Sequence, residues 1–262
     1  MNKNFKIILE YDGTNFFGWQ KQTNKRTIQG KIEKILSRIL NQKITITGSG
    51  RTDTGVHAFA QVANFHADTN ILPTDIQKGF NSLIKPQEIV IKECDIVNKD
   101  FHAQYNAIAK EYHYHILNTK DPCAINRQYS WHIKQSLDIR AMNKCCKALI
   151  GVHDFASFEN TGSTRTSSIR EVFSFKVISL KCDKNRIVFK ICAQGFLKGM
   201  VRNLIGTIVL TGLEKTSKKL KNAKRKNRIT FLEFVKILKA KDRAKAGIKA
   251  PAQGLFLKKV FY

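Results

Sequence analysis

Apolar and polar residues alternate with a period of two over several short stretches of this chain, which is typical of strands with one buried face. Other stretches place apolar residues three and four positions apart, which is typical of amphipathic helices. The alternation predicts strands over residues 5–11, 44–47, 61–67, 88–97, 110–117, 171–180, 186–194 and 254–261. The helical spacing predicts helices over residues 28–40, 74–84, 136–150, 200–210 and 231–238.

Two of the expected helices carry further signals. Thr27 stands where an N-cap residue is expected, directly before the helix over 28–40. The apolar face of that helix comprises Ile28, Ile32, Ile35, Leu36, Ile39 and Leu40. The core face of the helix over 200–210 comprises Met200, Val201, Leu204, Ile205, Ile208 and Val209. Arg202 lies off that face, so we expect it to point away from the core.

The expected elements fall into two series of similar layout. The first runs strand, helix, strand, strand, helix, strand as far as about residue 106, and a comparable series follows it. This mixture predicts an α+β protein whose sheets are covered by helices. We expect two similar halves, residues 1–106 and residues 107–262, although no repeat is visible residue by residue.

The balance of charged residues indicates which class of partner the protein could bind. The chain has 262 residues, and its 42% hydrophobic content is enough for a packed core. Lysine and arginine number 46 against 20 acids, which gives a net charge of +26. Such a charge favours attraction to a polyanion such as nucleic acid. The alternative is a solvated lysine-rich surface without a specific partner.

The cysteines and the N-terminus indicate a compartment. The cysteines at 94, 123, 145, 146, 182 and 192 form neither a CxxC pair nor a zinc spacing. Cys145 and Cys146 fall within an expected helix, which suits small buried thiols better than disulfides. The first residues lack the apolar core of a signal peptide, and no segment is typical of a membrane span. We expect a soluble cytoplasmic protein.

The run GSGRTDTGVHA, from Gly48 to Ala58, contains the strongest candidate chemistry. It places one carboxylate and one guanidinium two residues apart between glycines, which allow tight turns and close approach of a ligand. Asp53 is therefore a candidate nucleophile or acid/base group, with the cation of Arg51 beside it. The competing interpretation is structural, because an aspartate among Gly, Ser and Thr commonly caps a turn.

Six blocks of sequence stand in a fixed order from the start of the chain to its end. They comprise Tyr11–Gly13 with Phe17–Gln20 and Thr27–Gly30, Gly50–Ala58, Phe101–Ala103 with Lys110–Tyr114, Gly151–Phe158, Phe196–Leu197 with Met200–Asn203 and Gly206, and Ala250–Leu255. In this order they resemble the tRNA pseudouridine synthase A family. No single block is specific enough, but the ordered set covers nearly the whole chain.

The resemblance implies an isomerase that converts uridine to pseudouridine in the anticodon stem-loop of tRNA, at tRNA positions 38, 39 and 40. It also implies a mostly antiparallel, mixed central sheet that is shared by the two halves and flanked by helices. An RNA cleft between the halves and a homodimer are expected. Neither a cofactor nor a metal is expected, because the base is detached from C1′ and rejoined through C5 without a redox change.

The resemblance also assigns roles to residues. Asp53 matches the family's nucleophile, and Arg202 matches the arginine expected to pair with it. Arg51 matches an RNA-contacting arginine that assists base flipping, and Tyr112 matches a tyrosine that stacks on the target base. From the residues alone, Tyr112 and Tyr114 could be core residues on one strand face, and Arg202 could reach solvent. Whether Asp53 attacks C1′, attacks C6 or promotes a glycal path stays open.

Several other residues are weaker candidates. Lys110 and His57 are candidates for RNA contact, and His153 is expected to be structural or RNA-contacting. His113 and His115 share a strand face, but they lack a third partner at metal spacing.

One departure from the family pattern concerns the residue after Phe-His-Ala. Family members commonly carry arginine there, whereas this chain has Gln104. The change removes a cation that could contact phosphate. Lys110 and the basic run over 218–228 are candidates to compensate.

Three other functions compete with the isomerase interpretation. They are a non-catalytic RNA-binding protein on the same scaffold, a pseudouridine synthase acting on a different RNA, and a metal-dependent nuclease. Intact Asp53, Tyr112 and Arg202 argue against the first, and the ordered blocks argue against the second. The sequence shows no carboxylate or histidine cluster, which argues against the third.

Overall fold

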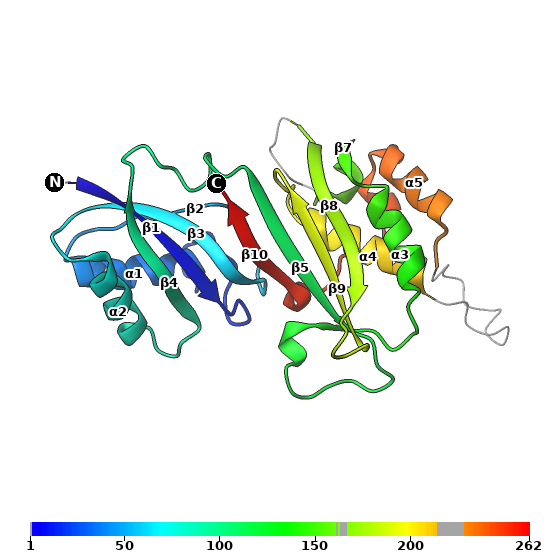
Figure 1. Ribbon diagram of the computed structural model, residues 1–262, viewed down its shortest axis with the longest axis horizontal. Helices are drawn as coiled ribbons and strands as arrows, with labels where there is room; N and C mark the ends of the chain where they lie inside the picture. The colour runs from blue at the N-terminus through cyan, green and yellow to red at the C-terminus, as the bar shows by residue number, and fades with distance from the viewer. Residues whose placement is uncertain (1, 161, 163–166, 214–227) are drawn as a thin grey trace. The chain divides into compact units, whose positions relative to one another are not determined.

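The structure is a computed structural model that describes residues 2–160, 162, 167–213 and 228–262. Three long antiparallel strands form its first part (Figure 1). They are β1 (Asn2–Tyr11), β3 (His57–Asp68) and β4 (Ile89–Val97), in the order β4-β1-β3. The short β2 (Thr47–Gly48) pairs with β3. The last strand, β10 (Leu255–Phe261), runs parallel to β3.

The alternation of β1 determines which of its faces is buried. Phe5, Ile7 and Leu9 are all 0% exposed, while the residues between them are partly exposed. Phe5 pairs with Phe65 of β3, and their rings stack at 5.2 Å. The apolar face of the sheet is therefore held by cross-strand aromatic packing.

Two helices accompany these strands. The first, α1 (Ile28–Leu40), begins where the side chain of Thr27 accepts a hydrogen bond from the Gly30 N–H, as its N-cap position predicts. The second, α2 (Pro73–Leu83), begins with a proline, which needs no N–H partner at that position. The two helices contact each other, and α2 packs on β4.

The remaining strands and helices form the second part. Its strands are β5 (Ala109–Leu117), β6 (Trp131–His132), β7 (Gly151–Asp154), β8 (Ile169–Ser179) and β9 (Arg186–Ala193), of which four follow the order β5-β9-β8-β7. Its helices are α3 (Ile139–Lys147), α4 (Met200–Gly212) and α5 (Phe231–Ala240). Figure 1 shows these helices grouped beside β8 and β9. Helix α3 packs mainly on strand β8.

Packing divides the chain into two units. The first comprises residues 1–110 with 256–262, and the second comprises residues 111–255. The chain therefore passes between the units inside β5 and again at the start of β10. The α+β class is confirmed, with mostly antiparallel pairing plus the parallel pairs β3–β10 and β5–β6.

The strand expected over residues 44–47 is wrong for most of its length, because only Thr47 belongs to a strand. Both Ile44 and Ile46 are buried, but their backbone groups bond to side chains of α1 instead of to another strand. The Ile44 N–H donates to Ser37 Oγ at 2.9 Å, and the Ile46 carbonyl accepts from Gln29 Nε2 at 3.2 Å.

The helix expected over residues 136–150 is shorter at both ends. Asp138 caps α3, and its carboxylate accepts from the N–H groups of Arg140 and Ala141. The strands β6 and β7 were not expected, because two- and four-residue segments are too short to show a clear alternation.

Helix α4 is buried almost all round rather than on one face. Asn203 and Thr207 are 0% exposed, as is the apolar Leu204, whereas Arg202 is partly exposed. The helix also packs closely against the segment near Ile248. A Cβ added at Gly206 would lie 1.8 Å from the carbonyl oxygen of Ile248, so this contact requires glycine.

Replacing Gly206 with alanine is therefore expected to destabilise the fold by about 2 kcal/mol or more, because helix and backbone must separate. Gly79→Ala is the matched control, since Gly79 is also helical and its added Cβ would lie 3.7 Å from Ile39 Cδ1. We expect the control to keep or gain stability, by up to about 1 kcal/mol. Urea unfolding measures both. Equal midpoints for Gly206→Ala and the unsubstituted protein would contradict the close packing.

Candidate functional site

Residues 49–56, here called the Asp53 loop, connect β2 to β3. Within this loop Arg51 is exposed, Asp53 is half-buried and Thr52 between them is buried. The Val56 N–H donates to the Asp53 carbonyl at 3.1 Å, which closes a turn after the aspartate. The side chains of Arg51 and Asp53 are thus carried by a loop that contains a hydrogen-bonded turn.

The segment Phe17–Gln20 holds the loop from one side. The Trp19 N–H donates to the Thr52 carbonyl at 3.0 Å. Gly18 has φ +79°, and a Cβ there would lie 2.7 Å from the Thr52 oxygen, so both its conformation and its position require glycine. The first residues of α1 hold this segment in turn, because the N–H groups of Ile28 and Gln29 donate to the carbonyls of Gly18 and Trp19.

The end of β1 holds the same loop through a second set of contacts. The hydroxyls of Tyr11 and Thr52 are hydrogen-bonded at 2.9 Å in a buried position. Gly13 packs on the far end of the loop, where an added Cβ would lie 2.1 Å from the Val56 oxygen. The sequence blocks Tyr11–Gly13, Phe17–Gln20 and Thr27–Gly30 therefore position Asp53, a role that sequence reasoning did not give them.

Lys110 and Gln61 fix the first residues of the loop. Lys110 Nζ donates to the Ser49 carbonyl at 2.6 Å, and Gln61 Nε2 donates to the Gly50 carbonyl at 2.9 Å. The Ser49 hydroxyl also donates to Gln61 Oε1 at 2.6 Å. The loop is therefore bonded on each side of Arg51, and that side chain remains exposed.

His57 follows the loop and is 1% exposed. Its ring stacks on Phe256 at 4.6 Å, and its Nδ1 lies 3.1 Å from the Gly13 N–H and 3.0 Å from Asp12 Oδ1. So buried a ring offers almost no surface to RNA, which favours a structural role for His57. Lys110, another expected RNA contact of this unit, holds the loop through its bond to the Ser49 carbonyl.

Tyr112 lies on β5 in the second unit and is 8% exposed. Its ring meets Phe196 edge to face at 5.1 Å and 86°. Tyr114, on the same strand face, is fully buried, and its hydroxyl donates to the Pro251 carbonyl at 2.8 Å. The block that contains Pro251 is thus bonded to the tyrosine strand.

Arg202 joins this neighbourhood from α4. Its Nε donates to the Ala250 carbonyl at 2.7 Å, and the Ala250 N–H donates back to the Arg202 carbonyl at 3.1 Å. Burial raises the pKa of Tyr114 above its usual range, and the nearby positive charge of Arg202 opposes that rise. Arg202 and the tyrosine strand therefore belong to one cluster of the second unit.

Asn203, the next residue along α4, is fully buried and fixes the helix. Its Nδ2 donates to the Phe158 carbonyl at 2.8 Å and to Asn160 Oδ1 at 3.2 Å. Its Oδ1 accepts from Arg243 Nη2 at 3.1 Å. Sequence reasoning missed the roles of Asn203 and Arg243. The block containing Asn203 was a usable signal, whereas Arg243 is one cation among many.

Asp53 and Arg51 belong to the first unit, whereas Tyr112 and Arg202 belong to the second. The ion pair between Asp53 and Arg202, and the facing of Asp53 by Tyr112, stay predictions. Gln104 is exposed in the first unit. Of the expected basic run over 218–228, residues 218–227 lie outside the described residues.

The histidines show no metal-binding arrangement in the part of the chain that the structure describes, where no group of three or more His, Cys, Asp or Glu side chains could hold a metal. His113 Nε2 is 2.5 Å from Glu111 Oε1, and the rings of His113 and His115 are 6.5 Å apart. His153 bonds through Nε2 to the Ile150 carbonyl at 3.1 Å.

All six cysteines are free thiols, and Cys145 and Cys146 are fully buried in α3, which confirms the expectation for that pair. Burial raises the pKa of both, and it raises the pKa of Cys94 to about 12. Within the described ranges, every helix is too short or too polar to cross a membrane.

The sequence matches known proteins over its whole length. Residues 7–106 and 145–262 match the profile of a family described as tRNA pseudouridine synthase. The tRNA pseudouridine synthase A of Thermoanaerobacter sp. (strain X514) is 41% identical over 260 residues, covering 99% of this chain and 100% of that protein. The tRNA pseudouridine synthase A 2 of Clostridium perfringens (strain 13 / Type A) is 40% identical over 261 residues, with the same coverage.

A solved structure is also similar, at a much lower level. The crystal structure of the archaeal box H/ACA sRNP Nop10-Cbf5 complex shares 12% identity, with a TM-score of 0.34, covering 78% of this chain and 42% of that chain. This similarity is too low to add to the family match.

Gly18→Ala is expected to loosen the Asp53 loop, because an added methyl at φ +79° collides with the Thr52 carbonyl. Hydrogen exchange measures this change at the amides of Trp19 and Val56, whose acceptors are the carbonyls of Thr52 and Asp53. Both should exchange faster than in the unsubstituted protein. Gly79→Ala is again the control and should leave these amides protected. Unchanged protection in Gly18→Ala would show that the glycine contact does not hold the loop.

Stability is expected to fall as pH rises above about 10, partly through Tyr11. Burial raises the pKa of Tyr11 above its ordinary value, so the folded chain holds this proton more tightly than the unfolded chain. The stabilising effect is fully present below pH about 10 and is lost as pH rises toward the folded-state pKa. Tyr11→Phe should therefore flatten the decline.

Urea unfolding between pH 8 and about pH 11 tests this expectation, since one proton corresponds to about 1.4 kcal/mol per pH unit. Tyr114 and Tyr262 also have raised pKa values, so part of the decline should survive in the variant. At pH 8 the variant should lose about 1 kcal/mol, because Thr52 Oγ1 loses its partner. An identical slope in both proteins would exclude Tyr11 as a source of the pH dependence.

Proposed function

The chain belongs to the tRNA pseudouridine synthase family, and we propose that it isomerises uridine to pseudouridine in tRNA with Asp53 as its nucleophile. The observation that carries the choice of residue is the Asp53 loop. Backbone and side-chain contacts from β1, from residues 17–20, from Gln61 and from Lys110 all converge on it, and they hold one half-buried carboxylate beside an exposed arginine.

The reaction suits a carboxylate held in this way. The bond between C1′ and N1 breaks, the base turns, and C1′ is joined to C5. The proton that C5 carried leaves to solvent, and N1 gains a proton, so uridine and pseudouridine have the same composition. A carboxylate acts here by attack at C1′, by addition at C6, or by promoting a glycal path. Each route needs an ionised, pre-oriented Asp53.

Three further side chains receive roles in this proposal. Arg202 pairs with Asp53 and keeps it ionised. Tyr112 stacks on the target base, a role supported by its aromatic ring and by the edge-to-face contact with Phe196 that holds this ring. Arg51 contacts RNA and occupies the space of the flipped nucleotide, a role supported by its exposure.

The setting of the reaction is part of the same proposal. The N-terminal half, residues 1–106, supplies Asp53 and Arg51, and residues 107–262 supply Tyr112 and Arg202. The substrate is the anticodon arm of tRNA, at uridines 38, 39 and 40, and the enzyme is a cytoplasmic homodimer. The net charge of +26 supports binding to a long polyanion.

Tritium release tests the function. The protein is incubated with unmodified tRNA labelled at uridine C5, without metal, and tritium in the solvent is counted. Asp53→Ala should lower the rate by about a thousandfold or more while tRNA still binds, because a nucleophile has no substitute. Asp100→Asn, an exposed aspartate of the same unit, is the matched control and should release label at the normal rate.

The other outcomes decide between the competing functions. RNA binding without release by the unsubstituted protein would support a non-catalytic scaffold. Release that survives Asp53→Ala would remove that residue from the mechanism. Mapping pseudouridine in the product tests the anticodon arm, release from a different RNA alone would change the substrate, and strand cleavage sensitive to EDTA would indicate a nuclease.

A further inference from the structure

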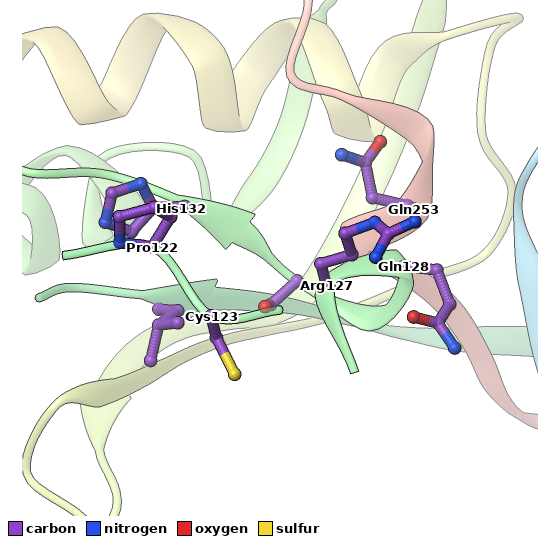
Figure 2. A pocket seen from close by; sticks show the side chains of 8 residues that line it. Pro122, Cys123, Arg127, Gln128, His132 and Gln253 are labelled. Atoms are coloured by element: carbon purple, nitrogen blue, oxygen red, sulfur yellow. The ribbon is translucent and has the colours of Figure 1, made fainter. Parts of the chain in front are cut away.

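A cavity of about 440 Å³ lies within the second unit (Figure 2), whereas the Asp53 loop belongs to the first. Its wall is formed by the end of β5, the loop that follows it, β6 and the short turn at Ala252–Gly254. Figure 2 shows Arg127, Gln128 and Gln253 at one side of the cavity, with Pro122 and His132 at the other.

The cavity is connected to the tyrosine strand by the chain itself. Leu117, which lines it, lies five residues beyond Tyr112 on β5, about 16 Å along a strand. Gln253, on its other side, follows Pro251, whose carbonyl accepts the Tyr114 hydroxyl. A few nucleotides of RNA can span that separation.

Two polar side chains of the cavity, Arg127 and Gln253, have unused bonding capacity. Arg127 makes one side-chain hydrogen bond, from Nη1 to the Ala124 carbonyl at 3.3 Å, and no carboxylate among the described residues pairs with it. A guanidinium has five N–H donors, so most of them remain available. The amide of Gln253 forms no hydrogen bond within the described ranges, and it carries both donors and an acceptor.

These groups specify the chemistry of a ligand. The guanidinium suits a phosphate, and the Gln253 amide suits the edge of a base or a ribose hydroxyl. Leu117 and Pro122 add an apolar wall against which a base can lie. A volume of about 440 Å³ falls within the range of small-ligand sites and is too large for a phosphate alone.

We propose that this cavity binds one unstacked ribonucleotide of the tRNA substrate, a few nucleotides from the target uridine, with Arg127 on its phosphate and Gln253 on its base. Proteins read RNA largely through bases that are splayed out of the stack. The site would therefore help to select which uridine reaches Tyr112. The inference rests on the proposed function, because that function supplies the RNA.

Binding and kinetics with unmodified tRNA test the proposal. Arg127→Ala should raise the tRNA Kd and the KM of tritium release about tenfold, and reduce the slope of log affinity against log salt by about one. Its kcat should stay within about twofold, since the cavity holds none of the reacting atoms. Arg140→Ala, an exposed arginine on α3, is the matched control and should leave affinity and slope unchanged.

Gln253 separates hydrogen bonding from charge. Gln253→Ala should raise KM while leaving the salt slope unchanged, because the amide is neutral. Gln253→Glu should weaken binding further, because it places a carboxylate in a cavity that receives an anionic nucleotide. These variants also keep the proposal testable if Arg127→Ala unfolds. An Arg127→Ala protein that is folded and matches Arg140→Ala in Kd and slope would overturn the proposal.

Two outcomes identify the source of the ligand and separate this proposal from the previous one. If Arg127→Ala weakens binding of free uridine 5′-monophosphate but leaves tRNA binding unchanged, the cavity is a small-nucleotide site and the RNA assignment is wrong. If the unsubstituted protein releases no tritium but Arg127→Ala still weakens tRNA binding, the isomerase assignment fails and the RNA subsite stands.

Discussion

The hydrogen bond between the Trp19 N–H and the Thr52 carbonyl, made possible by the glycine before Trp19, is the contact on which the candidate site depends. Together with the bonds from Ile28 and Gln29 to the carbonyls of Gly18 and Trp19, it links the start of α1 to the backbone next to Asp53. A side chain at position 18 would separate residues 17–20 from the Asp53 loop. The position of the carboxylate therefore depends on the absence of a side chain at Gly18 as well as on the hydrogen bonds. A site supported in this way is oriented before any ligand arrives.

The second unit uses a different physical means for the same purpose. There the buried amide of Asn203 satisfies three polar partners at once and so fixes the rotation of α4. Arg202 is the adjacent residue and the partly exposed one, so its guanidinium is directed by its neighbour's bonds. An unpaired amide at that depth would cost free energy, which makes the rotation specific. In each unit, the candidate site residues are therefore held by neighbouring groups whose hydrogen bonds are already formed within the protein.

Local patterns predicted most of the fold because they report local physics. The faces of α1 and β1 follow from the period of their apolar residues, and Thr27 gives the start of α1. The strand expected near Ile46 is wrong for a different reason, since side chains of the preceding helix α1 bond to its backbone groups in place of a neighbouring strand. Family blocks identified Asp53 and Arg202 as candidates but gave no role to the glycines and amides around them. Close approach between segments far apart in sequence leaves no periodic signal.

The pairing of Arg202 with Asn203 has a consequence for protein engineering. An arginine copied alone onto the helix of another scaffold would point wherever that helix happened to rotate. To reproduce its direction, the recipient would also need acceptors equivalent to the Phe158 carbonyl and Asn160, a donor like Arg243, and a glycine-width contact like that of Gly206. To transplant the arginine, a designer would therefore have to transplant helix α4 together with the buried polar network around Asn203, of which Arg202 is the partly exposed neighbour.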